Sequence, residues 1–420
     1  MKLEDLTYEQ CVMQGVGPLV FPRRLEKSRA ESQESKVETH ERLQMKAVCM
    51  QNMQMQAKMQ IVLSRAWKAL TEAGIQPVLM KGLGLAQYYP EPSMRQWSDI
   101  DLFVGKAQYH PACAAMRAAF PEAFKFDEEL DHYKHYNLIA DGVSIEIHRV
   151  SVALTHPRDI RRYERMERFG MAHAIPLKYI NTDTHVDGAI NIDKEEIKNA
   201  ESPVADCNLQ ALASQSACEQ APRQIDHQVP PADPDTQSPP DSLQKCAIAY
   251  ENNKNEIVVP EVTFNVLLVF LHSWEHMLNG GANIRQLCDL ALMLKHTKNK
   301  IDAVRLKRWL KDLRALDVWQ IYMGILVHEL GMREEEVLFY NERVVPRAQK
   351  MIAWILNDPR QEQPKIQAKN RLVRKWGTMK KRMRNAERIA EISPAYAQHM
   401  KAAVWLSGLS RLFAPDRRWE

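Results

Sequence analysis

The sequence predicts an α+β protein, in which a first part of strands and helices is followed by a helical part. Two observations lead to this prediction. Apolar and polar residues alternate over 99–104 and over 135–150, as they do in half-buried strands. From residue 262 onward, apolar residues recur with helical spacing instead. With 420 residues, 45% of them hydrophobic, the chain is long enough to bury a sizeable core.

Residues 1–40 are expected to be an N-terminal extension. A long helix is predicted over Glu41–Ala73, because Gly74 stands where a glycine often ends a helix. Residues 75–80 then have the composition of a short buried strand. Helical spacing resumes over 83–89, before two prolines.

The turn between this strand and this helix is formed by Lys81 and Gly82. The first N–H groups of a helix are unpaired and carry partial positive charge, so such a turn suits a phosphate. We therefore expect Lys81 and Gly82 to bind phosphate. The alternative is that Lys81 is only a charged residue at the end of a strand.

Two aspartates stand one residue apart in the next predicted strand. Asp99 and Asp101 alternate with Ile100, Leu102 and Val104, so both carboxylates point to one face while the apolar residues face a core. Two anions so close repel each other unless a positive group lies between them. We expect a divalent cation, Mg²⁺ or Mn²⁺, to be that group. The alternative is an exposed strand face with solvated acids.

A helix is predicted over 107–120, and a hairpin follows it. His135–Ala140 and Val143–Val150 flank Asp141-Gly142, a preferred two-residue hairpin turn. Alternation in the second strand places Glu146 and His148 on the face opposite its apolar residues. Glu146 is thus a third candidate ligand, and we expect it also to act as a general base. His148 is expected to orient Glu146, to contact the substrate, or to be structural.

Three carboxylates of this kind can hold two divalent ions, which clamp the attacking and leaving oxygens in phosphoryl or nucleotidyl transfer. Arg95 precedes the aspartate strand, and its guanidinium has the planar set of donors that suits a phosphate. The front part, residues 41–180, is therefore predicted to be the catalytic domain.

Residues 181–246 are predicted to be a disordered acidic linker. They contain no aromatic residue, seven of the 22 prolines, and twelve acidic against four basic residues. The rest of the chain therefore carries a net charge of +12, which favours an anionic substrate. Residues 247–420 are expected to form a helical domain, with helices over 262–279, 284–296, 302–316 and 318–330.

Two features of the helical part have more than one interpretation. His272 and His276 are spaced i, i+4, but the sequence His-Ser-Trp-Glu-His misplaces the general base of a zinc protease, so packing or lining of the active site is preferred. Residues 365–388 contain ten basic residues and one acidic residue. A solvated helix face is preferred there over a nucleic-acid surface.

The sequence resembles the uncharacterised nucleotidyltransferases of the DNA polymerase beta-like superfamily. The resemblance is carried by residues 78–82, by 89–92 with Arg95, by 99–102, by 145–148, and by a helical stretch from His272 to Ala291 that includes Asp289. Together these motifs span about residues 60–295. The wider superfamily has Gly-Ser where this chain has Lys81-Gly82, so the motif for the metal site is carried over more completely than the phosphate turn.

The resemblance implies a mixed sheet with flanking helices, and Mg²⁺ bound by Asp99, Asp101 and Glu146. It also implies transfer of a nucleoside monophosphate from an NTP, with ATP as the expected donor, to an unknown small molecule or protein. Asp289 would cap a helix contact or brace the site. The alternative function is a catalytically silent protein that binds nucleotide, nucleic acid or a partner on the same fold.

Composition sets further expectations. The seven cysteines are scattered and include no Cys-x-x-Cys pair, so neither a disulfide framework nor a zinc knuckle is expected. No apolar run approaches the length of a membrane span, and the N-terminus lacks the layout of a secretory signal. A cytoplasmic protein is therefore expected. The oligomeric state is left open.

Overall fold

The computed structural model describes residues 3–30, 36–126, 130, 132–154, 156–177, 256–279, 281–357 and 371–413. Contacts between residues divide the chain into two compact units, of which the first joins residues 1–182 with 253–420. All elements described below belong to this first unit. The predicted linker, residues 181–246, lies outside the described residues.

A five-stranded sheet with the order β1-β2-β5-β4-β3 is the centre of the front part. β2 runs parallel to β5, and the other neighbouring pairs are antiparallel, so the sheet is mixed, which confirms the predicted fold class. The strands are β1 (Val78–Met80), β2 (Ile100–Phe103), β3 (Phe124–Lys125), β4 (His135–Ala140) and β5 (Val143–His148).

The predicted hairpin is formed by β4 and β5. Its turn places Asp141 at φ 53° and Gly142 at φ 74°, two positive values that aspartate and glycine tolerate better than most residues. The two-residue turn sets the register, which pairs Ala140 with Val143 and, at the other end, His135 with His148. The apolar residues of β5 are buried, as the alternation predicts.

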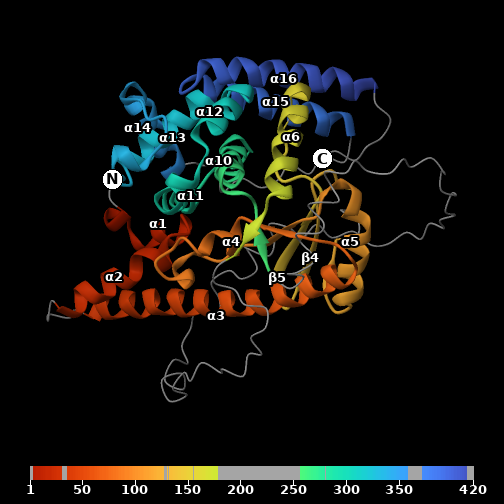
Figure 1. Ribbon diagram of the computed structural model, residues 1–420. Coiled ribbons are helices and arrows are strands. Elements are labelled where there is room, and N and C mark those ends of the chain that lie inside the picture. The colour runs from red at the N-terminus through yellow and green to blue at the C-terminus, as the bar shows by residue number, and fades with distance from the viewer. Residues whose placement is uncertain are drawn as a thin grey trace. The chain divides into compact units, whose positions relative to one another are not determined.

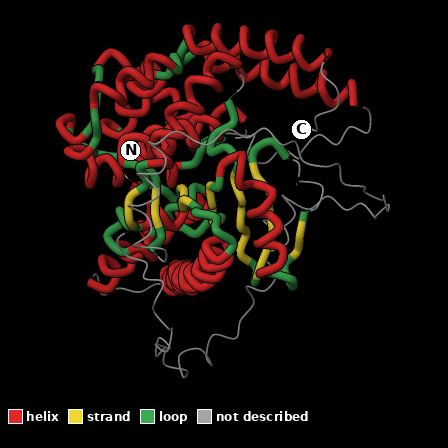
Figure 2. The backbone as a smooth tube through the Cα atoms, turned by 45° about the vertical axis from the view of Figure 1, so that its right-hand side comes forward, coloured by secondary structure: helices red, strands yellow, loops and turns green. Residues whose placement is uncertain are grey.

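Helices accompany the sheet along the front part. They are α1 (Tyr8–Met13), α2 (Gly17–Ala30), α3 (Lys36–Glu72), α4 (Gly82–Ala86), α5 (Gly105–Ala119) and α6 (Pro157–Ala172). α3 begins five residues before the predicted helix, and it passes close to the sheet, as Figure 2 shows almost end-on. Gly74, at φ 74°, lets the N–H of Ile75 turn back to the carbonyl of Leu70 at 2.9 Å, which closes the predicted helix end.

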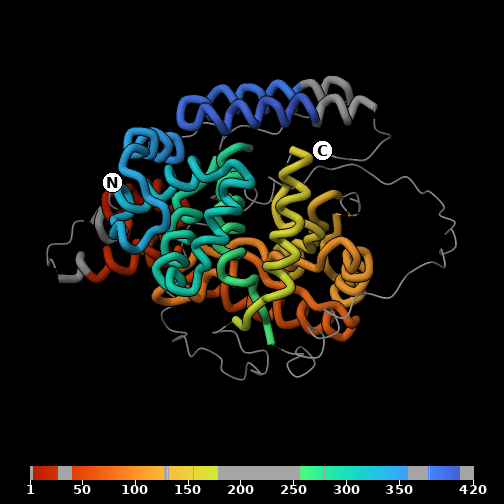
Figure 3. The backbone as a smooth tube through the Cα atoms, turned by 45° about the horizontal axis from the view of Figure 1, so that its top comes forward, coloured from red at the N-terminus to blue at the C-terminus, as the bar shows by residue number. Residues whose placement is uncertain are grey.

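The back part is helical, as predicted. Its helices are α10 (Val262–Asn279), α11 (Ile284–Thr297), α12 (Ala303–Asp312), α13 (Leu316–His328), α14 (Val345–Leu356), α15 (Arg371–Ala390) and α16 (Pro394–Phe413). α15 and α16 pack side by side (Figures 1 and 3). The core between the helices includes a cluster of aromatic residues, among them Phe270, Trp319 and Tyr322. Among the described helices, none is both long and apolar enough to cross a membrane.

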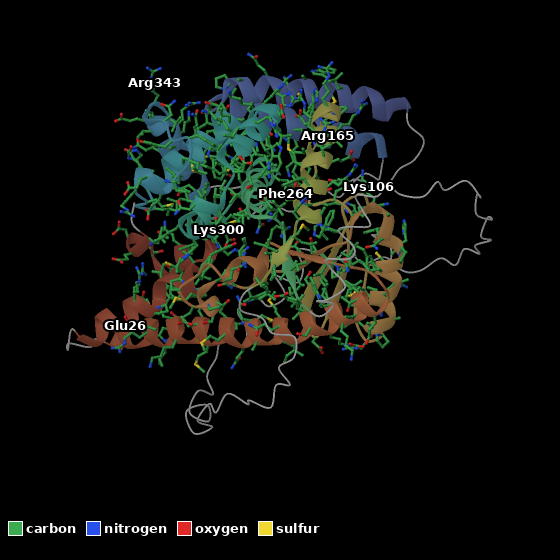
Figure 4. The ribbon with its side chains drawn as sticks, viewed as in Figure 1. Glu26, Lys106, Arg165, Phe264, Lys300 and Arg343 are labelled. Atoms are coloured by element: carbon green, nitrogen blue, oxygen red, sulfur yellow. The ribbon has the colours of Figure 1, made fainter. Side chains whose placement is uncertain are left out.

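Front and back parts are joined through α6, α10 and a small sheet. Phe264 of α10 is fully buried and contacts Tyr163 of α6 and Trp309 of α12. Figure 4 shows Phe264 in the interior and Lys106 at the outside. Gly170 of α6 has no side chain, which lets the two helices approach each other: a Cβ there would lie 2.1 Å from Phe264.

β6 (Ile175–Pro176) pairs antiparallel with β7 (Val258–Val259). The N–H of Leu177 also donates to the carbonyl of Ile257 at 2.8 Å. The ends of the described chain on either side of residues 178–255 are therefore hydrogen-bonded neighbours.

Candidate active site

Two of the three predicted carboxylates face each other on the parallel strands at the centre of the sheet. Asp101 of β2 is the register partner of Glu146 of β5. Asp101 is buried, and the side chain of Glu146 is 18% exposed. Asp99 stands one residue before β2; part of the residue is exposed to solvent, but the surrounding protein desolvates its carboxyl group. Alternation along a strand gives Asp99 and Asp101 the same direction, so the structure brings all three acids together.

Lys81 approaches the same carboxylates from the end of β1. Its backbone adopts φ 49° and ψ −144°, and its buried Nζ lies 2.6 Å from Oδ1 of Asp101. The next residue, Gly82, also has a positive φ of 35°, and a Cβ there would lie 2.8 Å from the backbone oxygen of Asp99. The turn thus needs a glycine at 82, because the backbone of residue 99 lies against it. α4, which follows the turn, has only five residues.

His148 connects two of the acids. It is fully buried, and its Nε2 lies 2.8 Å from Oδ1 of Asp101 and 2.9 Å from Oε2 of Glu146. Its Nδ1 lies 3.2 Å from the carbonyl oxygen of Val150. Burial lowers the pKa of His148, but the hydrogen bonds with Asp101 and Glu146 outweigh burial and raise it overall. The predicted role of orienting Glu146 therefore agrees with its position.

His135 is a site residue that the sequence analysis did not single out. It lies opposite His148 in the hairpin, and its Nδ1 is 3.1 Å from Oε2 of Glu146 without forming a hydrogen bond. Burial lowers the pKa of His135 to about 3, so its ring is neutral at physiological pH. The sequence did contain a signal for this residue, because the Asp141-Gly142 turn fixes the pairing of 135 with 148.

The three acids respond differently to their surroundings. Burial opposes ionisation of Asp101, but the charge of Lys81 and the hydrogen bond from His148 hold its pKa well below the usual range. Burial likewise opposes ionisation of Glu146. The hydrogen bond from His148 and the nearby His135 outweigh burial and lower the pKa of Glu146 to about 2. For Asp99, desolvation by the surrounding protein, together with the charges of Glu146 and Asp101, raises the pKa to about 7.

The pKa shifts of the three acids indicate whether these residues suit a divalent cation. The surroundings hold the pKa values of Asp101 and Glu146 low, whereas desolvation and the charges of these two acids oppose ionisation of Asp99. Carboxylate oxygens are the ligands that Mg²⁺ prefers. The residues present therefore fit a divalent cation held by Asp99, Asp101 and Glu146.

Arg95 lies elsewhere. Its guanidinium is buried and binds Asp289 of α11 with two contacts, Nε to Oδ1 at 2.8 Å and Nη2 to Oδ2 at 2.9 Å. The hydroxyl of Tyr89 also donates to Oδ1 of Asp289, at 2.9 Å. This cluster links the front part to the helical part. Asp289 thus takes part in a contact between the two parts, while the phosphate-binding role of Arg95 stays a prediction.

α10 brings further polar residues toward the site. The Nδ1 of His272 is buried and has no hydrogen-bond partner in the described structure. Burial and then the positive charge of Lys81 hold the pKa of His272 well below its usual range. Glu275 of the same helix forms an ion pair with Lys134, just before β4, with both carboxylate oxygens 3.1 Å from Nζ. His272 is therefore near Lys81, but no substrate role follows from its position alone.

A family model covers the part of the chain that contains this site. It describes uncharacterised nucleotidyltransferases, and it matches residues 4–190, which include all five strands of the central sheet. The resemblance inferred from the motifs is thereby confirmed for the front part. No curated protein and no solved structure matches the chain.

The matched residues 4–190 contain every residue predicted to bind metal or phosphate. Lys81, Asp99, Asp101, Glu146 and His148 come together at the centre of the sheet. The match ends at residue 190, so the helices that contain His272 and Asp289 lie beyond it. The basic stretch 365–388 falls partly outside the described residues, and its nucleic-acid role stays a prediction.

Proposed function

We propose that the protein transfers a nucleoside monophosphate from an NTP, such as ATP, to a hydroxyl group of an acceptor and releases pyrophosphate. One observation supports this proposal above the others: Asp101 and Glu146 are register partners on parallel strands, and Asp99 lies close enough for their charges to add to desolvation in raising its pKa. The match of residues 4–190 to a nucleotidyltransferase family model supports the reaction type.

In this proposal Asp99, Asp101 and Glu146 hold Mg²⁺ or Mn²⁺, which would neutralise the charge of the phosphates and align the reacting oxygens. Lys81 binds the NTP phosphates next to the cation. An ammonium group has three donors, and the contact of Lys81 with Asp101 uses one of them. Gly82 allows the backbone to approach the same place, because a side chain there would meet the backbone of Asp99.

Glu146 serves charge stabilisation in this arrangement more than proton abstraction. With a pKa of about 2 it is a weak base at neutral pH, and a base works best when its pKa is near the working pH. His148 positions Glu146 and Asp101, because one of its nitrogens contacts both of them.

The proposal is tested by replacing two ligands at once, Asp99→Asn with Asp101→Asn. We expect the double variant to lose Mg²⁺-dependent NTP binding and all labelling of acceptors, when pure protein is incubated with each labelled NTP, Mg²⁺ and a cell extract. The matched control is Asp141→Asn, which removes an exposed carboxylate from the nearby hairpin turn, where asparagine tolerates the positive φ. Unchanged NTP binding and labelling in a folded double variant would refute the proposal.

A further inference from the structure

Three side chains around Glu146 are arranged as metal ligands in an unusual combination. One potential ligand atom each of His135, Glu146 and His148 lies within 4.8 Å of the other two. The nearest pairs are closer: Oε2 of Glu146 is 2.9 Å from Nε2 of His148 and 3.1 Å from Nδ1 of His135. Neighbouring ligands in a shell with metal–ligand bonds of about 2.1 Å are separated by roughly 3 Å.

Both imidazoles direct a nitrogen at Glu146. The Nδ1–H of His148 donates to the carbonyl oxygen of Val150 at 3.2 Å, and its Nε2, which donates a proton to the carboxylates when no metal is bound, would give up that proton on binding a metal. Metal-binding histidines are commonly oriented in this way by a backbone carbonyl. The Nδ1 of His135 is buried without a hydrogen-bond partner, which leaves its lone pair available.

Oδ1 of Asp101 contacts two groups: it lies 2.6 Å from Nζ of Lys81 and 2.8 Å from Nε2 of His148. The ligand atoms that lie together next to them are two imidazole nitrogens and one carboxylate oxygen. Such a mixed set favours divalent ions of the transition series, whereas Mg²⁺ prefers oxygen ligands alone.

We propose that His135, Glu146 and His148 bind a divalent transition-metal ion, of the class that includes Mn²⁺, Co²⁺ and Zn²⁺, beside Asp99 and Asp101. The inference deepens the proposed function, because it assigns one of the ions of the same site to a second kind of metal. Binding of this ion requires no nucleotide, so it is measured separately from the reaction.

The test uses the full chain without a histidine tag, freed of metal with a chelator and titrated with Co²⁺, whose visible absorption spectrum reports nitrogen ligands. We expect one equivalent to bind to these residues and to resist a large excess of Mg²⁺. His135→Gln and His148→Gln should each weaken binding by at least the roughly 10- to 100-fold that loss of an outer-shell partner already costs. Far-UV circular dichroism verifies the fold, and His135→Gln remains informative if His148→Gln does not fold.

Two controls make the result specific. His110→Gln replaces an exposed histidine of α5 and should leave the titration unchanged. His156, Asp159 and His399 form a second cluster that could take Co²⁺, so the titration is repeated in His156→Gln to identify any equivalent bound there. Wild-type affinity and spectrum in folded His135→Gln, displacement of Co²⁺ by Mg²⁺, or no Co²⁺ binding at the site would each overturn the inference.

The outcome is separable from that of the proposed function. Tight Co²⁺ binding that needs His135, combined with no labelling of any acceptor, would refute nucleotidyl transfer and leave the metal site in place. Mg²⁺-dependent labelling that is unaffected by His135→Gln, together with no Co²⁺ binding, would refute the transition-metal site and support nucleotidyl transfer.

Discussion

The surroundings of Asp99 oppose its negative charge. Desolvation and the neighbouring charges of Glu146 and Asp101 raise its pKa from 3.8 to about 7. Between these two values the unfolded chain has released the proton that the folded protein still holds. Asp99 therefore contributes its full share to the free energy of unfolding below about pH 4, and this contribution is lost as the pH rises to about 7.

We predict from this that Asp99→Asn stabilises the metal-free protein near pH 7 and above, because the variant never has to ionise this position. The gain should shrink as the pH falls toward 3.8. Urea unfolding of both proteins over this pH range, with a chelator present, measures it. A difference in unfolding free energy that does not change with pH, or that grows toward low pH, would contradict the raised pKa. Mg²⁺ should reduce the advantage, since a bound cation stabilises the ionised form in the wild type.

For single residues, the sequence predicted the direction in which side chains point but not the residues that they contact. Alternation was enough to put Asp99 and Asp101 on one face of their strand and Glu146 on the face opposite the apolar residues of its own strand, because strand geometry fixes which way side chains point. The partner of Arg95 could not be predicted in the same way. Its contact with Asp289 joins residues 194 positions apart, and such a contact depends on how the helical part packs against the sheet.

Among the elements, α6 and α10 approach each other at Gly170. A Cβ at this position would lie 2.1 Å from Cγ of Phe264, a fully buried ring that cannot move freely. We predict that Gly170→Ala destabilises the protein by about 2 kcal/mol or more, since overpacking usually costs ~1–3 kcal/mol and outweighs the gain in helix propensity.

The matched control is Gly377→Ala in α15, where no atom of the described residues lies within 4 Å of the added methyl group. That variant should be neutral or stabilised by up to about 1 kcal/mol. Both free energies come from chemical denaturation followed by circular dichroism. Equal stability of the two variants would mean that α6 and α10 are not packed as closely as described.

Sequence patterns predicted some elements better than others. The hairpin β4–β5 and the helix over 262–279 were predicted because a turn signal and a long apolar period are local features. β3, β6 and β7 have two residues each, and no period can be read from so few residues. They exist because a neighbouring strand supplies their hydrogen bonds. The parallel pairing of β2 with β5 is likewise set by tertiary packing, so the sequence only raised the possibility that these strands are neighbours.

At the scale of the whole molecule, the pairing of β6 with β7 holds together the described residues on either side of 178–255. Leu177 and Ile257 are hydrogen-bonded across it, so a hairpin loop of a few residues can join the two sides. We predict that replacing residues 178–255 with a short glycine-rich turn leaves the melting temperature and the Co²⁺ affinity of the chain unchanged. Thermal unfolding and the cobalt titration of the shortened chain, next to the full chain, measure both. An insoluble or unfolded shortened chain would count against this prediction.

The same pairing makes this position suitable for the insertion of another protein domain. The entropy lost on closing a loop rises only with the logarithm of its length, so doubling the residues between β6 and β7 costs roughly 0.6 kcal/mol. A fluorescent protein inserted at this place would be tethered at both ends beside α10. Such a fusion would allow the protein to be followed in living cells without attaching anything to either end of the chain.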